Sequence, residues 1–168
     1  MNVDPEADVE VQIRGLMLDP VTNMPIVVLK DVSSDTVLPI WVGVFEANAI
    51  ALELEKTPTP RPMTHDLLRN LARGLNAKVT KVVVSDLRED TFFATIWMQQ
   101  ENEQVTLDAR PSDAIALALR WDCPIFVSRK VLSQSRQTAN ETGTNVNADE
   151  LRRWLENLND EDTGRYKM

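Results

Sequence analysis

The segment from Val105 to Trp121, VTLDARPSDAIALALRW, most constrains what this chain can fold into. Its first residues alternate between apolar and polar, which predicts a short strand that ends near Asp108. A tight corner follows, where Ser112 is expected to cap a helix and Asp113 favours the positive end of the helix dipole. Residues 114–120 are largely apolar and rich in alanine, so this helix must be buried. A carboxylate at the start of a buried helix has to be paired, hydrogen-bonded or bound to a cation.

The composition is that of an ordinary soluble protein, with 43% apolar and 26% charged residues among 168, and it predicts one domain with a tail. The net charge of −8 argues against a nucleic-acid binder that depends on clustered basic residues. It leaves open an enzyme that reaches phosphodiesters through a cation held by carboxylates. An acidic start, no apolar run long enough to cross a membrane and a single cysteine, Cys123, predict a cytoplasmic protein.

Hydrophobic patterning predicts strands and helices in alternation over the first two thirds of the chain. The expected strands are 9–13, 26–29, 37–42, 79–84, 91–98 and 105–107, and the expected helices are 46–55, 64–75 and 114–120. Three prolines in residues 57–62 predict a stiff, extended linker between the first two helices. In the helix that follows, Thr64 is expected to be the cap, and its leucines are expected to be buried: Leu67, Leu68, Leu71 and Leu75.

The chain resembles itself when it is shifted by 65 positions, because residues 46–54 then align with residues 111–119. We interpret this as a duplicated strand-strand-strand-helix-helix unit, which predicts an α+β domain with a mixed β-sheet. A chance similarity between two helices rich in alanine and leucine is the alternative interpretation.

The composition changes after residue 132, which predicts three regions. Residues 1–132 form the domain, with its core in 9–132, and the polar residues 133–147 form a flexible linker. Residues 148–168 form a C-terminal helix and tail. The apolar stripe of that helix is expected to dock on the same molecule or on a partner subunit: Leu151, Trp154, Leu155 and Leu158.

The single histidine, His65, opens a helix directly after the proline-rich linker. Histidine exchanges protons near neutral pH, and Arg61 can hold a phosphate, so the two are candidate catalytic residues. A purely structural role for His65 is the alternative.

A second candidate group lies around the start of the central helix. Asp108 and Asp113, with Glu46 at the equivalent helix start, are candidate oxygen ligands for Mg²⁺ or Mn²⁺. Arg110 is a candidate for stabilising a scissile phosphate, and Ser112 joins Arg61 and Arg110 as a candidate substrate-binding residue. In the alternative interpretation, the arginine pairs internally with a carboxylate while the neighbouring polar residues only cap the helix.

Three segments of the chain resemble the bifunctional nuclease family of bacteria and plants. They are LPIWVGVFEANAIALELEKTPTPRPMTHDLL, FFATIW and LDARPSDAIALALRWDCPIFV, within residues 9–132. The resemblance implies an α+β domain that self-associates and a nuclease activity on RNA and DNA. Its polar motifs fall on Glu46, Arg61, His65, Asp66, Asp108, Arg110, Ser112 and Asp113.

The sequence therefore predicts a metal-assisted hydrolase of RNA and DNA phosphodiesters with low sequence specificity. In that hypothesis His65, Asp108, Asp113, Arg110 and Arg61 are catalytic. The expected partners are nucleic acid as substrate and a second copy of the chain, with a dimer favoured and no membrane. A non-catalytic oligomeric module and a small-molecule binder that uses the proline-stiffened cleft are the alternative functions.

Overall fold

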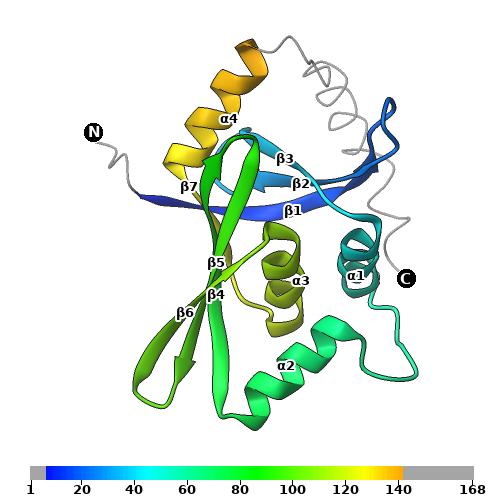
Figure 1. The fold of residues 1–168 in the computed structure, drawn as a ribbon, viewed down its shortest axis with the longest axis vertical. Helices are drawn as coiled ribbons and strands as arrows, with labels where there is room; N and C mark the ends of the chain where they lie inside the picture. The colour runs from blue at the N-terminus through cyan, green and yellow to red at the C-terminus, as the bar shows by residue number, and fades with distance from the viewer. Residues whose placement is uncertain (1–6, 142–168) are drawn as a thin grey trace.

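The computed structural model describes residues 7–141 and has the predicted α+β fold, with four helices and one mixed sheet of seven strands in this part of the chain (Figure 1). The strands are β1 (Asp8–Leu18), β2 (Pro25–Asp31), β3 (Val37–Trp41), β4 (Ala77–Arg88), β5 (Thr91–Gln100), β6 (Glu103–Ala109) and β7 (Ile125–Ser128). The helices are α1 (Val44–Leu54), α2 (Thr64–Gly74), α3 (Pro111–Trp121) and α4 (Arg129–Glu141).

The strand order in the sheet is β3-β2-β1-β7-β4-β5-β6. Two antiparallel three-stranded units, β1–β2–β3 and β4–β5–β6, therefore flank β7, a strand that the sequence patterns did not predict. β7 pairs antiparallel with β1 and parallel with β4, and this one parallel pair makes the sheet mixed. β7 also interrupts the second copy of the proposed repeat, so the duplication stays a prediction.

α3 is the buried centre of the molecule, as its alanine content predicted. It contacts α1, α2, β4 and β5. Four of its apolar side chains are at most 1% exposed: Ala114, Ile115, Ala116 and Ala118. Small side chains allow neighbouring elements to approach closely, so α1 and α2 can both pack on α3.

The prediction that Ser112 caps this helix is wrong. Pro111 occupies the first helical position and Arg110 is the cap residue. Proline suits that position because its missing N–H would have no partner inside the helix anyway. Ser112 therefore lies within the first turn and is buried, with 6% of its surface exposed.

The predicted burial of the α2 leucines is also wrong. The four side chains are 43–61% exposed: Leu67, Leu68, Leu71 and Leu75. His65 is the buried residue of α2, and Asp66 reaches a partner on α3. Because these polar residues face α3, the leucine stripe turns away from it. Thr64 is not the cap either, since the cap is Met63, whose N–H donates to Oδ2 of Asp66 at 2.9 Å.

α4 begins directly after β7 and extends to Glu141, so residues 133–141 of the predicted linker are helical. Val131 is fully buried and its N–H donates to the Ser128 hydroxyl at 3.3 Å, which anchors the start of the helix. The remainder of that linker and the predicted helix and tail at 148–168 lie outside the described residues. Within residues 7–141, no helix is long and apolar enough to span a membrane.

Candidate functional site

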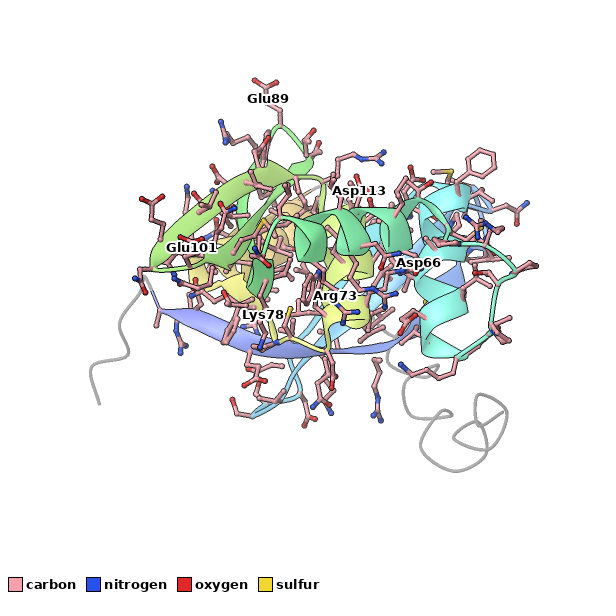
Figure 2. All side chains as sticks on the ribbon, turned by 90° about the horizontal axis from the view of Figure 1, so that it is seen from below. Asp66, Arg73, Lys78, Glu89, Glu101 and Asp113 are labelled. Carbon is pink, nitrogen blue, oxygen red and sulfur yellow. The ribbon has the colours of Figure 1, made fainter. Side chains whose placement is uncertain are left out.

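Charged side chains from three helices meet where the N-terminal part of α2 crosses α3 beside α1. This region, which we call the three-helix junction, holds two hydrogen-bonded networks. Figure 2 shows Asp66 and Asp113 in the same part of the molecule, whereas Glu89 and Glu101 lie on hairpins further away.

The first network is centred on His65 and Asp113. Nε2 of His65 lies 2.9 Å from Oδ1 of Asp113, and His65 is only 7% exposed. An ionised carboxylate can only accept hydrogen bonds, so Nε2 carries the hydrogen and donates it. This contact fixes the orientation of the imidazole ring.

Arg110 extends the network to a second carboxylate. Its Nε donates to Oδ2 of Asp113 at 2.8 Å, and one of its Nη atoms lies 3.0 Å from Oε1 of Glu46. Burial alone raises the pKa of Asp113, but hydrogen bonds from Arg110 and His65 outweigh it and leave that pKa below its usual value. The hydrogen bond and charge of Asp113 raise the pKa of Arg110, so both groups are charged at neutral pH.

Gly43 determines where the Glu46 carboxylate can lie. Gly43 is the cap residue of α1, and a Cβ added to it would lie 2.1 Å from Oε2 of Glu46. Any other residue at position 43 would therefore push this carboxylate away. Its backbone angle, φ −69°, is open to all residue types, so space and not conformation favours glycine here.

The second network is centred on Arg120, whose side chain is only 2% exposed. Its Nε donates to Oδ1 of Asp66 at 2.8 Å, and its other nitrogens donate to the carbonyl oxygens of Ala116 and Ala49 at 2.9 and 3.0 Å. One guanidinium thus joins α1, α2 and α3. Burial raises the pKa of Asp66, but hydrogen bonds from Met63 and Arg120 hold it below its ordinary value.

The structure brings four of the predicted site residues into one network and leaves Arg61, Asp108 and the buried Ser112 outside it. Glu46, His65, Arg110 and Asp113 are joined. Asp108 is exposed on β6, opposite Thr95, and Arg61 lies on the proline linker.

The predicted cation ligands do not form a preformed site. Among residues 7–141, no group of three or more histidine, cysteine, aspartate or glutamate side chains is placed to hold a metal ion. Both oxygens of Asp113 are engaged, and the guanidinium of Arg110 bridges it to Glu46. A divalent ion bound by these carboxylates would have to displace Arg110, so the residues present do not fit Mg²⁺ or Mn²⁺ in this arrangement.

Sequence reasoning missed Arg120 and Gly43. Arg120 had a readable signal, because a single cation in an apolar helix must find a partner inside the protein. Gly43 had a weaker signal, a glycine three residues before a glutamate at a helix start. Only the folded arrangement shows that this carboxylate bends back over the glycine.

Comparisons with known proteins find one matching family model and several similar sequences. A family model described as the bifunctional nuclease domain matches residues 27–140. Uncharacterized protein Rv1829 of Mycobacterium tuberculosis H37Rv is 38% identical over 154 residues, which are 89% of this chain and 92% of that protein.

Two plant proteins are more distant. Bifunctional nuclease 1 of Oryza sativa subsp. japonica is 27% identical over 116 residues, 67% of this chain and 35% of the rice protein. Bifunctional nuclease 1 of Arabidopsis thaliana is 25% identical over 123 residues, 71% of this chain and 38% of the plant protein. This chain therefore spans little more than a third of either plant relative.

Proposed function

The chain belongs to the bifunctional nuclease family, and on this basis we propose that it hydrolyses phosphodiester bonds in RNA and DNA with low sequence specificity, using the His65 network. The observation that carries the proposal is the hydrogen bond from His65 to Asp113. A carboxylate that orients an imidazole leaves the second ring nitrogen available for proton transfer. The family and this geometry support a hydrolase more than either does alone.

Each residue of the network has a defined task in this proposal. His65 moves a proton to or from the reacting oxygen, and Asp113 fixes the ring. Arg110, whose side chain is 64% exposed, binds a phosphate oxygen and neutralises its developing charge. Glu46 holds Arg110 in place. The carboxylates do not fit a bound cation without rearrangement, so the proposal assigns chemistry only to the chain's own residues.

The test is cleavage of single-stranded RNA and single-stranded DNA by the full chain, with the wild type compared with His65→Gln. The variant is expected to lose about 100-fold or more of the activity, the usual contribution of a positioned general acid or base. Asp35→Asn serves as the control, because Asp35 is fully exposed in the turn between β2 and β3. A parallel series with EDTA shows whether a divalent cation participates.

Equal cleavage by the wild type and His65→Gln would identify a contaminating nuclease and overturn the proposal. Circular dichroism of the variant separates loss of chemistry from loss of folding. A folded, inactive variant is the expected result.

A second candidate function is a non-catalytic oligomeric module, and the exposed leucines of α2 favour it. Leu68, Leu71 and Leu75 line an apolar groove of about 270 Å³ against β4, β5 and β6. β6 is an edge strand of the sheet, with Val105 and Leu107 also facing the groove and more than a third exposed. Contiguous exposed apolar surface marks interaction sites. We propose that a second copy of the chain covers this groove.

A further inference from the structure

A separate pocket lies beside the three-helix junction, and we propose that it binds a phosphate group. The proline linker (residues 57–62), the end of α1 and the first turns of α2 enclose a volume of about 310 Å³. Three arginines line it: Arg61, Arg69 and Arg120. Its size is within the range of small-molecule sites.

The balance of charges in the pocket favours an anion. Two carboxylates line it, and each already has a basic partner: Asp66 pairs with Arg120 at 2.8 Å, and Glu53 pairs with Lys56 at 3.2 Å. Within residues 7–141, no ion pair engages Arg61 or Arg69. Arg69 interacts with the charge of Asp66, which Arg120 already pairs, so three guanidinium groups face two carboxylates in the pocket. The lining therefore has an excess of positive charge in a chain whose net charge is −8.

Arg69 and Arg61 supply the donors that a phosphate group would need. Each guanidinium carries a planar fork of N–H groups, and a phosphate oxygen is the acceptor that best matches this fork. Nε of Arg69 is itself covered by protein atoms, so a ligand would be bound by the terminal nitrogens of this side chain.

The wall of the pocket is stiff before any ligand arrives. Pro58, Pro60 and Pro62 restrict the backbone of the linker, and the Thr59 hydroxyl donates to the carbonyl oxygen of Arg61 at 3.0 Å. Arg61 is therefore presented from a constrained loop. Binding to a preorganised site loses little conformational freedom, which favours affinity.

This pocket is distinct from the His65 network, since Glu46, His65, Arg110 and Asp113 do not line it. The inference therefore does not rest on the proposed nuclease activity. A phosphate group can arrive as free inorganic phosphate, as a mononucleotide or within a nucleic-acid backbone. The three sources share the same charged oxygens, so the experiment has to separate them.

The experiment is calorimetric titration of the full-length chain at constant ionic strength with inorganic phosphate, with adenosine 5′-monophosphate and with a short single-stranded oligonucleotide. Each ligand is tested on the wild type, Arg61→Gln, Arg69→Gln and Arg88→Gln. Arg88 is the matched control, because it is exposed at the β4–β5 hairpin and outside the pocket. His65→Gln is added to separate this site from the nuclease proposal.

We expect saturable binding of at least one ligand, weakened roughly tenfold or more in Arg61→Gln and in Arg69→Gln, as for lost charged hydrogen bonds. Arg88→Gln is expected to bind all three ligands as the wild type does. His65→Gln is expected to bind inorganic phosphate and adenosine 5′-monophosphate as the wild type does. Binding of the oligonucleotide alone would identify a backbone phosphate as the source. Absence of saturable binding by all three ligands, or an equal loss in Arg88→Gln, would overturn the inference. Arg61 is exposed on the linker, so its variant is expected to fold even if Arg69→Gln does not.

Discussion

His65 and Asp113 are 48 positions apart in the chain, yet Nε2 of one lies 2.9 Å from Oδ1 of the other. The contact joins the first turn of α2 to the first turn of α3. It exists because α3 is buried at the centre of the molecule and α2 turns its polar side towards it. The same packing that exposes the α2 leucines thus creates the candidate site.

Replacing Asp113 with asparagine is expected to reduce nuclease activity by about 100-fold, because an amide does not stabilise a protonated imidazole as a carboxylate does. The variant also loses the ion pair with Arg110. The rate constant under substrate saturation is the relevant measurement. Activity equal to that of the wild type would show that this carboxylate has no part in the chemistry.

Replacing Gly43 with alanine is expected to lower activity on the order of tenfold, because a misplaced catalytic group reduces the rate steeply. The new Cβ would displace the Glu46 carboxylate that holds Arg110. Stability is expected to change little, since the group that must move is the end of a flexible side chain. Activity and urea unfolding are measured together on the same preparation.

Gly74→Ala is the matched control for that experiment. Gly74 ends α2, and a Cβ added there meets no atom within 4 Å. The nuclease activity of Gly74→Ala is expected to equal that of the wild type. If both alanine variants lost the same activity, the proposed role of Gly43 would be wrong.

Replacing Asp66 with asparagine is expected to lower the free energy of unfolding by about 3 kcal/mol, because it leaves the buried Arg120 without its counter-charge. The difference from the wild type depends on pH. Folding lowers the pKa of Asp66, so its ion pair stabilises the native state above the unfolded value of 3.8 and is lost as the pH falls through the folded value. Urea unfolding at pH 7 and at a series of pH values below 4 measures both effects.

The stability difference is therefore expected to be constant near neutral pH and to shrink in acid. Asp35→Asn removes the ion pair of a fully exposed carboxylate with Lys30 and is expected to give a much smaller change. A difference in the free energy of unfolding that grew as the pH fell would contradict the stabilising ion pair between Asp66 and Arg120.

Replacing Leu71 and Leu75 with glutamine is expected to shift the chain from dimer to monomer, because both side chains are 58% exposed beside the apolar groove. Light scattering over a range of protein concentrations measures the mass. Val21→Gln is the control, since Val21 is 88% exposed in the turn after β1 and lies outside the groove. A wild type that is monomeric at every concentration would end the oligomer proposal.

Three segments of the sequence already resembled the bifunctional nuclease family. The sequence by itself also determined the α+β class, most of the strands and the buried helix at α3. These properties depend on local patterns, such as alternation in strands and the all-round apolar surface of an alanine-rich helix. The candidate site was partly readable for the same reason. His65, Arg110 and Asp113 follow local signals, a lone histidine after a proline linker and polar residues at a helix start.

Only the tertiary structure decided which partners these residues have. Arg110 pairs with Glu46 in the first turn of α1, and Arg120 takes acceptors from three helices. The tertiary structure also decided which face of α2 is buried. The face with His65 packs against α3, and the leucine stripe is exposed. A sequence pattern shows that a helix has an apolar and a polar face. Which face is buried depends on the charged groups of the neighbouring element. Those contacts join residues far apart in the chain, so local patterns do not reveal them.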